Sequence, residues 1–566
     1  MSLFKKLLKI TVLTVFVINF IFFSTIQAKS PKENVNANNI SDYFSGIILL
    51  NENKYKDSYK YLKKLDGLEK DHLNYSSKYL YSLVNSGYFN KAFNFSKKLE
   101  KEQQSSFESD LIIGIYHFKN LKYDLSNQYF LKAKKRNSIS LLENYIADTL
   151  LVWSKLNKSQ IEEAKLNLKK LDNRFVNLKR IQEVFLSCFL NQKNTNQLFF
   201  ELTSDSKTDF SRYNYFYANY LYGNKKVEEA KKVIENSLKK NPRNLILNQY
   251  KIDITNQKNS FDFDCKNKNH VAAELLYISA NALASQSIYP LSNFYLNLSK
   301  YLNKNFHTFD TLMAENFYKI GDFSKSKEIY LRLANYGSAF RWYSKKQISR
   351  ILILEDEKEN AINLLSKAYD QLLFRGIYET FDYAEFLKNN ENFEKSIKYY
   401  SEILEIINER HPLYPEVTDS RGVAYERTNN WKKAEKDLLA SLKANPDQAY
   451  VINYLAYSWI EQGVKIKKSL EMLQKANKLK SNDPYIIDSL GWALFKLERY
   501  KESKDYLQLA VRLMPADPIV NDHYGDVLWK NGEEIQARYY WNYVLNLEKT
   551  NKDLKNNIEK KLIKGL

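Results

Sequence analysis

Residues 484–496, PYIIDSLGWALFK, and residues 518–530, PIVNDHYGDVLWK, decide the fold of this chain. Each stretch begins with proline and carries a glycine in its eighth place. A small residue recurs in this register at Gly422, Ala456, Gly491 and Gly525, with spacings of 34, 35 and 34. Self-similarity at a fixed period of this length is the signature of a repeat architecture. The spacing therefore predicts an array of repeated units rather than several unrelated domains.

A second series of small residues follows the first by 12 or 13 positions, and it consists of Ala434, Ser469, Ser503 and Ala537. Two antiparallel helices approach most closely where their side chains are small, so each unit is predicted to be a helix pair that crosses at these positions. Large residues one helical turn beyond the second series share its face. These are Leu438, Leu473, Leu507 and Trp541, and we predict that they belong to the core.

The same period extends weakly toward the N-terminus. Ala314, Ala361 and Ala384 indicate units that start near residues 307, 342 and 377, while Gly46 and Gly114 indicate two earlier ones. Within residues 141–210 and 245–272 the pattern places no unit. The predicted organisation is a signal peptide at 1–28, a divergent array at 29–244, a possible linker at 245–272, central repeats at 273–412, clear repeats at 413–547 and a capping helix at 548–566.

The first residues have the pattern of a secretory signal peptide. Lys5, Lys6 and Lys9 precede an apolar run at residues 10–23, and small residues lead to a cleavage point after Ala28. Because Ile26 is larger than is usual before a cut, an uncleaved membrane anchor is the alternative. No later stretch reaches the length of apolar sequence that a membrane span requires. We therefore expect a periplasmic or exported protein, with a membrane tether if the segment is not removed.

Composition argues against several other classes. The chain has 14 glycines, 9 prolines and 44% apolar residues, which favours helices over a turn-rich β protein. The net charge of +20 comes from lysines mixed with acids along helix faces, without a module for nucleic acid, so we expect no nucleic-acid partner. Two isolated cysteines, Cys188 and Cys265, are interpreted as free and buried, with a single bridge in an oxidising compartment as the alternative.

The sequence carries no recognisable catalytic or metal-binding pattern. The six histidines are scattered singly, without the spacing of a metal site. There is no nucleophile elbow and no glycine-rich phosphate loop. We therefore predict no catalytic, cofactor-binding or metal-binding residues, no cofactor and no enzymatic activity, with an enzyme of unrecognised site as an alternative.

The units starting at Pro415 and Pro484 resemble the tetratricopeptide repeat (TPR) family. This resemblance implies an all-α, right-handed superhelical solenoid of helix-turn-helix repeats. In that family, positions 2, 5, 9 and 12 of each first helix face a concave groove. In this chain these positions hold Glu416, Asp419, Val423 and Glu426, then Tyr450, Asn453, Tyr457 and Ile460, then Tyr485, Asp488, Trp492 and Phe495, then Ile519, Asp522, Asp526 and Trp529.

Residues 483–495 and 517–529 are similar to the ends of exported proteobacterial TPR proteins, some of which are lipoprotein adaptors for a periplasmic protease. This chain departs from those adaptors because it has no cysteine at the predicted cleavage point. We therefore expect a non-catalytic periplasmic scaffold that binds a partner protein or peptide in its groove, such as an envelope protease or an assembly factor. A structural protein that binds cell-wall glycan or a membrane surface is the alternative.

The aromatic and acidic groove positions of the last three units are the candidate partner-binding residues. Aromatic side chains give contact area at low entropic cost, and the carboxylates favour a basic or apolar partner segment. The equal alternative is that these aromatics pack between neighbouring first helices. The candidates are Tyr450, Asn453, Tyr457, Tyr485, Asp488, Trp492, Phe495, Asp522, Asp526 and Trp529.

Overall fold

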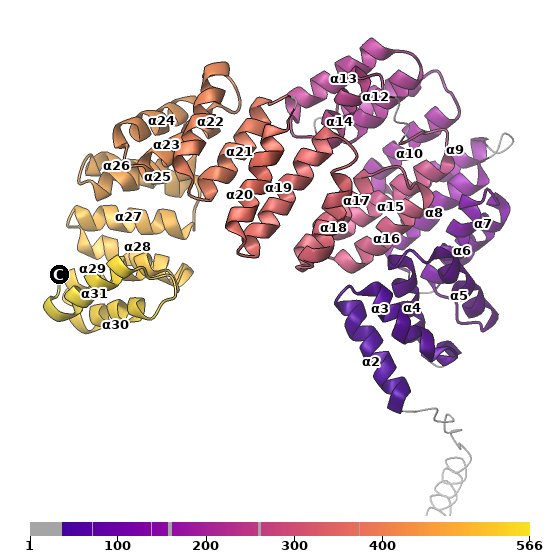
Figure 1. Ribbon diagram of the computed structural model, residues 1–566, viewed down its shortest axis with the longest axis horizontal. Coiled ribbons are helices and arrows are strands. Elements are labelled where there is room, and N and C mark those ends of the chain that lie inside the picture. The colour runs from indigo at the N-terminus through magenta and orange to yellow at the C-terminus, as the bar shows by residue number, and fades with distance from the viewer. Residues whose placement is uncertain are drawn as a thin grey trace, which may run out of the picture. The chain divides into compact units, whose positions relative to one another are not determined.

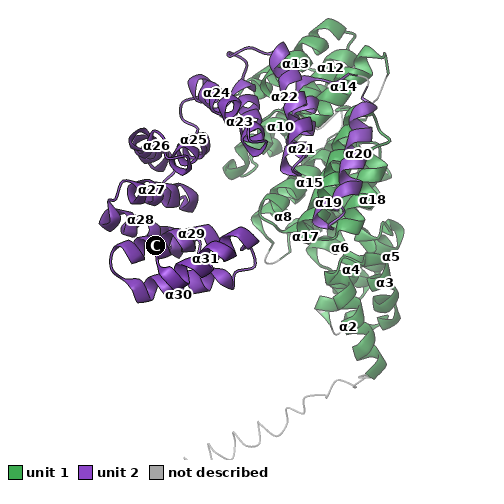
Figure 2. Cartoon of the chain, turned by 60° about the vertical axis from the view of Figure 1, so that its left-hand side comes forward, with its two compact units in different colours: residues 1–351 green, residues 352–566 purple. Residues whose placement is uncertain are grey.

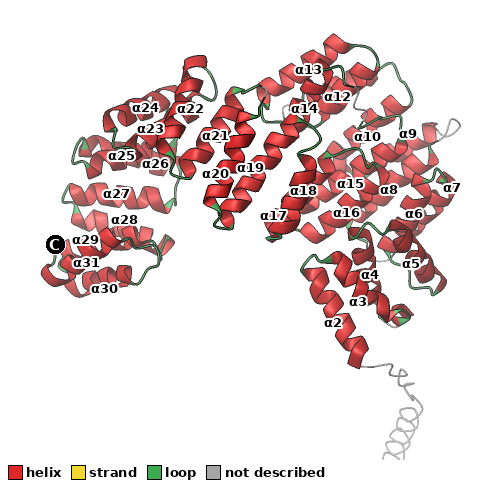
Figure 3. Ribbon diagram, viewed as in Figure 1, coloured by secondary structure: helices red, strands yellow, loops and turns green. Residues whose placement is uncertain are grey.

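The computed structural model describes residues 37–70, 72–136, 139–156, 161–205, 207–258, 262–372 and 374–566. The predicted signal peptide, residues 1–28, lies outside these ranges. Every regular element within them is helical (Figure 3), which confirms the all-α prediction. Among the helices described, none is long and apolar enough to cross a membrane.

The chain divides into two compact units, residues 1–351 and 352–566 (Figure 2). The division falls within one helix, α19 (Ser338–Leu354). Figure 1 labels the helices along the chain. Before α19 the helices are α2 (Ala37–Asn51), α3 (Tyr55–Leu62), α4 (Leu73–Asn85), α5 (Phe89–Lys101), α6 (Phe107–Lys119), α7 (Tyr123–Lys134), α8 (Leu141–Lys155), α9 (Ile161–Lys169), α10 (Val176–Phe189), α11 (Thr195–Thr203), α12 (Tyr213–Gly223), α13 (Val227–Lys240), α14 (Leu245–Thr255), α15 (Lys268–Ser285), α16 (Tyr289–Leu302), α17 (Thr308–Ile320) and α18 (Phe323–Leu333).

Unit 2 is a regular stack of helix pairs closed by a last single helix. Its helices after α19 are α20 (Lys358–Asp370), α21 (Ile377–Asn389), α22 (Phe393–Ile406), α23 (Tyr414–Arg427), α24 (Trp431–Ala444), α25 (Ala449–Glu461), α26 (Ile466–Leu479), α27 (Pro484–Lys496), α28 (Tyr500–Leu513), α29 (Pro518–Lys530), α30 (Glu534–Leu545) and α31 (Lys552–Lys564). Unit 1 also contains short 3-10 turns at Lys63–Leu65, Leu68–Lys70 and Asn173–Phe175. Segment 141–210, where the period placed no unit, forms α8 to α11.

The small residues lie at the helix crossings, as predicted. A Cβ atom added to Gly491 would lie 2.7 Å from Cγ of Leu507, and one added to Gly422 would lie 3.0 Å from Cγ of Leu438. An added carbon would clash at Gly491 and would be tightly packed at Gly422, so the two helices of each pair approach closely at these crossings. The predicted core residues Leu438, Leu473, Leu507 and Trp541 are all fully buried.

In five helix pairs the serine at the second small position makes the same hydrogen bond across the pair. Its hydroxyl donates to the backbone carbonyl of the residue 12 positions earlier, which a small residue leaves accessible. The bond is Ser58 to Gly46 at 2.8 Å, Ser126 to Gly114 at 2.9 Å, Ser292 to Ala280 at 2.8 Å, Ser326 to Ala314 at 2.9 Å and Ser503 to Gly491 at 2.7 Å. Each of these pairs therefore has a buried hydrogen-bond donor and its acceptor at fixed positions of the repeat, in addition to small side chains at the helix crossing.

In unit 1, the pair formed by α15 and α16 folds back onto earlier helices. Helix α15 packs against α8, and α16 packs against α4 and α6 (Figure 1). The rings of Phe294 and Tyr81 lie 4.7 Å apart, and Nζ of Lys119 lies 3.6 Å from the ring centre of Tyr301. A solenoid whose repeats touch only their neighbours would not make these contacts. Unit 1 therefore covers a face of its own N-terminal helices with a later pair.

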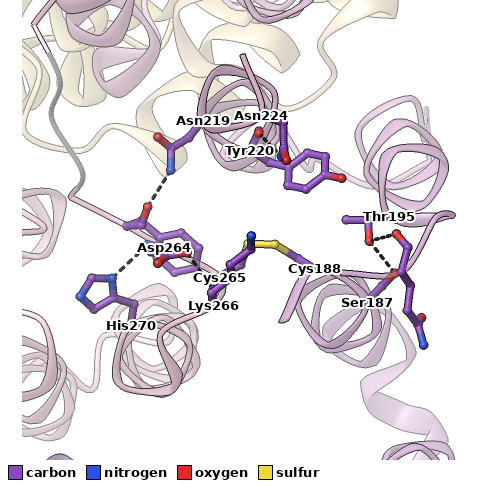
Figure 4. The surroundings of a disulfide bond; sticks show 12 residues. Ser187, Cys188, Thr195, Asn219, Tyr220, Asn224, Asp264, Cys265, Lys266 and His270 are labelled. Carbon is purple, nitrogen blue, oxygen red and sulfur yellow. Dashed lines mark hydrogen bonds between the residues drawn. A yellow bond between two sulfur atoms is a disulfide. The ribbon is translucent and has the colours of Figure 1, made fainter. Parts of the chain in front are cut away.

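The two cysteines form a disulfide, so the interpretation of two free thiols is wrong. Cys188 in α10 is bonded to Cys265, and their Cα atoms are 6.0 Å apart (Figure 4), a separation that suits a disulfide. Segment 245–272, predicted as a possible linker, contains α14 and the start of α15. The carbonyl of Phe263 accepts a hydrogen bond from Asn219, and the backbone N–H of Asp264 donates to Nδ1 of His270. The first contact joins the segment to α12, and the second lies within the segment.

Candidate functional site

The predicted partner-binding residues lie on α25, α27 and α29 of unit 2, and we call positions 2, 5, 9 and 12 of these first helices the first-helix face. An aspartate followed by proline starts α27 and α29. The Asp483 carboxylate accepts hydrogen bonds from the backbone N–H groups of residues 485 and 486, and Asp517 does the same for residues 519 and 520. This cap and the preset proline backbone begin each helix at the same register. Equivalent positions therefore recur along the face.

Position 2 is exposed in three successive repeats. The side chains of Tyr450, Tyr485 and Ile519 are 55%, 57% and 40% exposed. The hydroxyl of Tyr450 donates to Asp483 at 3.0 Å, and Nζ of Lys480 lies 3.9 Å from its ring centre, so this ring is held in place while one side remains open. The face thus presents a row of aromatic and aliphatic side chains, which we call the position-2 row.

The aromatics at positions 9 and 12 are packed inside the unit. The Trp492 ring stacks on His523 at 3.9 Å and on Phe495 at 4.7 Å. Its Nε1 donates to Glu461 at 2.7 Å, while Tyr457 packs against the same core cluster. Only 7% of Trp492 and 8% of Phe495 is exposed. This packing between neighbouring first helices is the alternative interpretation stated above, and a contact of these rings with a partner stays a prediction.

The predicted carboxylates are paired with cations of the same chain. Asp488 lies 3.1 Å from Nδ1 of His523, and Nζ of Lys561, in α31, donates to Asp522 at 2.6 Å and to Asp526 at 2.7 Å. Burial favours neutral His523, yet the neighbouring Asp488 charge holds its pKa above the usual value. Burial, together with the charge of Asp522, raises the pKa of Asp526 to about 6. Sequence reasoning missed these cations because they come from the next repeat and from the cap.

The two remaining candidates, and helix α23 that precedes the first-helix face, differ in environment. The Oδ1 atom of Asn453 is buried and has no hydrogen-bond partner, whereas Trp529 is half-buried beside Trp541, with 5.4 Å between ring centres. In α23 the pKa of Asp419 is raised to about 6, first by burial and also by the nearby Glu385. The surface left for a partner is therefore chiefly the position-2 row.

Within the described ranges, no group of three or more histidine, cysteine, aspartate or glutamate side chains is arranged to hold a metal ion. The first-helix face likewise brings together no nucleophile with a base. The first-helix face offers contact area and charged groups, which suit recognition of another molecule.

Comparison with known proteins finds similarity to a family of helical repeats over part of the chain. Residues 330–550 match the tetratricopeptide repeat profile. The TPR repeat-containing protein PA4667 of Pseudomonas aeruginosa is 32% identical over 116 residues, which is 20% of this chain and 18% of that protein. The chain therefore spans less than a fifth of that relative's length.

Solved structures with related helical repeats cover about a third of this chain. They include MamA of Desulfovibrio magneticus RS-1, at 18% identity over 32% of this chain and 99% of that one, with a TM-score of 0.27. YrrB, described as a TPR protein with an unusual peptide-binding site, is 16% identical over 34% and 97% of the two chains, with a TM-score of 0.28. Pseudomonas aeruginosa pilF is 20% identical over 33% and 86%, also with a TM-score of 0.28.

Proposed function

We propose that this chain, whose residues 330–550 are tetratricopeptide repeats, is a non-catalytic periplasmic scaffold that binds a partner protein or peptide. Stacked repeats give extended surfaces for protein–protein interaction. The partner class we propose is an envelope protease or an assembly factor. The observation that carries the proposal is the position-2 row, because three successive repeats expose an apolar side chain at one position. An extended segment rises about 3.3 Å per residue, so it can offer side chains to several repeats in turn.

A photo-crosslinking amino acid at position 450 or 485 of the full chain tests this site in cells. We expect a reproducible crosslinked protein of the same identity from both positions. Tyr539 in α30 is the matched control, because it is 68% exposed but lies on a second helix. Position 539 should not give this adduct. Adducts shared equally by all three positions, or none from 450 and 485, would reject the position-2 row as the site.

Binding measured with the captured protein then gives the energetic test. The double variant Tyr450→Ala, Tyr485→Ala should weaken binding about tenfold or more, since exposed aromatic anchors are typical hot spots of interfaces. Tyr539→Ala should leave the affinity unchanged. Circular dichroism of each variant should match the parent, because these rings are more than half exposed.

The proposed periplasmic location is supported by the disulfide and by the signal-peptide pattern of the sequence. Disulfides persist in oxidising compartments such as the periplasm and are rare in the cytosol. Cys188 and Cys265 are the only two cysteines of the chain, and both are almost fully buried. A single bridge of this kind fits a protein that folds after export.

Alkylation of thiols in intact cells checks this location. Cells lysed directly into denaturant with a maleimide reagent should yield unlabelled chain, because both sulfurs are already bonded. Reduction before labelling should add two reagents per molecule. The control is Cys188→Ser, which should show one labelled thiol without reduction. Two labelled thiols in the parent before reduction would contradict an oxidised, exported protein.

A further inference from the structure

The last helix of the chain, α31, contacts the first-helix face of the last repeat (Figure 1). Nζ of Lys561 lies 2.6 Å from Asp522 and 2.7 Å from Asp526, which hold positions 5 and 9 of α29. Position 12 is covered as well, because a Cβ atom added to Gly565 would collide with the ring of Trp529. A segment of the chain itself therefore occupies three of the four groove positions of the last repeat.

Few apolar contacts hold α31 in this place. Ile558 is its one buried residue, Leu554 and Leu562 are only partly buried, and most of its other side chains are exposed. By comparison, helices α28 and α30 bury four and three residues. Burial of apolar surface supplies most of the free energy of helix packing. We therefore expect α31 to be held less firmly than the helix pairs beside it.

A double ion pair of Lys561 joins α31 to α29. The side chain of this lysine is 15% exposed, while Asp522 and Asp526 are 8% and 4% exposed, so one lysine faces two buried carboxylates. Without that cation the two carboxylates would be buried with no counter-charge from α31, which is costly. Release of α31 would expose them to water and relieve this cost. The lysine therefore decides whether α31 stays on the face.

We propose that α31 is a releasable cap, which closes the groove positions of the last repeat until a partner segment that carries a lysine or arginine displaces it. Such a segment can offer Asp522 and Asp526 the same kind of cation that Lys561 gives them. Ile519, the last member of the position-2 row, is one helical turn before Asp522 and is 40% exposed. A segment bound along the row would therefore meet the edge of the cap. This inference rests on the proposed partner-binding function and adds the regulation of the same face.

Hydrogen exchange of the full chain tests the cap without any partner. In the parent, the α31 amides should exchange about tenfold faster than those of α29, through local opening. Lys561→Met keeps the apolar volume and removes the cation, so it should accelerate α31 exchange about tenfold further and leave α27 and α28 unchanged. The matched control is Lys560→Met, because this neighbouring lysine is exposed, and it should exchange as the parent does.

The exchange experiment can overturn the proposal in two ways. If α31 and α29 exchange together in the parent and in Lys561→Met, α31 is a fixed part of the last repeat and not a cap. If Lys560→Met accelerates α31 as much as Lys561→Met does, the ion pair with Asp522 and Asp526 is not what holds the helix in place.

A synthetic peptide of residues 551–566 tests whether the face under α31 accepts a basic segment. The full-chain variant Ile558→Asp, Lys561→Met should open the cap and bind this peptide with a Kd of about 100 μM or below, and the parent should bind it about tenfold more weakly. The same peptide with Lys561→Met should bind the opened variant about tenfold more weakly than the unaltered peptide. Equal binding to parent and opened variant, or no binding at about 1 mM, would contradict the cap.

Affinity for the protein captured at positions 450 and 485 separates this inference from the proposed function. If α31 competes with that protein, Lys561→Met should raise its affinity about fivefold or more, and Lys560→Met should leave it unchanged. An unchanged affinity in Lys561→Met would overturn the cap and leave the position-2 row in place. Without a captured protein the row is rejected, while the exchange and peptide results still decide whether α31 opens.

Discussion

Arg212→Met is expected to destabilise unit 1 by about 3–5 kcal/mol, because it leaves a carboxylate buried without its cation. Glu274 in α15 is fully buried. The Arg212 guanidinium binds it with two hydrogen bonds, 2.7 Å from Nε and 2.8 Å from Nη2, and stacks 3.9 Å from the ring centre of Tyr277. Methionine preserves the apolar volume and removes the charge. Hydrogen exchange of the full chain should show the loss as faster exchange of the α12 and α15 amides.

The pH dependence identifies the cause of this loss. Burial raises the pKa of Glu274, and Arg212 opposes that rise. In Arg212→Met this cation is missing, so the pKa of Glu274 in the folded state should rise further above its value in the unfolded state. A group with a raised pKa stabilises the fold below its unfolded pKa and loses that contribution as pH rises through the folded pKa. The variant should therefore approach the parent at acidic pH and fall furthest behind at neutral pH.

Two controls separate the buried charge from other effects of the substitution. Arg332→Met breaks the exposed pair with Glu328, whose side chains are 49% and 62% exposed, and should cost less than about 1 kcal/mol. The double variant Arg212→Met, Glu274→Leu should recover most of the stability, since an apolar pair can replace a buried ion pair. An equal loss in the single and double variants would show that packing, not charge, accounts for the effect.

The repeat could be predicted from sequence because its determinants are local and periodic. Gly491 and Leu507 are 16 positions apart, and the same relation recurs at Gly422 and Leu438. Packing of one helix on the next depends on residues within about one period, so spacing alone indicates the contacts. The recurring serine bond, as from Ser503 to the carbonyl of Gly491, follows the same period.

The contacts of unit 1 that were not predicted join residues far apart in sequence. Asn297 donates to Asn85 at 2.9 Å across 212 positions, and Cys188 meets Cys265 across 77. Neither contact lies at a multiple of the repeat that the pattern could extend. Helix α15 is buried on nearly all sides, so it has no polar face to mark which neighbours cover it. Periodicity predicts neighbours in the stack, but not a pair that folds back.

For a related reason, only part of the candidate site could be predicted from the sequence. The candidate residues that the family register gave lie on α25, α27 and α29, but their exposure depends on what the next repeat and the cap contribute. Trp492 is covered by His523, and Asp526 is neutralised by Lys561 from a helix 35 positions later. Tyr485 is 57% exposed, whereas Ile486 next to it in the first turn of α27 is fully buried. The register therefore predicts where a candidate residue lies along its helix, whereas packing of the neighbouring repeat decides whether its side chain is exposed to a partner.

Gly491→Leu is expected to open the α27–α28 pair and to destabilise unit 2 by about 3 kcal/mol. The first side-chain carbon alone would lie 2.7 Å from Cγ and 2.8 Å from Cδ2 of Leu507, and 3.3 Å from its backbone nitrogen. Leu507 is fully buried and cannot move aside, and the backbone contact forces the helices apart. Separation would also stretch the bond from Ser503 to the carbonyl of Gly491.

The destabilisation by Gly491→Leu should be largest at the crossing of α27 and α28 and should decrease along the stack, because each repeat is stabilised mainly by its neighbours. Hydrogen exchange of the full chain should accelerate in α27 and α28 first, and leave unit 1 unchanged. Gly223→Ala is the matched control: this glycine ends α12 with no atom within 4 Å of an added Cβ, so alanine should be neutral or slightly stabilising. If both variants keep the exchange of the parent, small volume at position 8 is not what holds the repeats together.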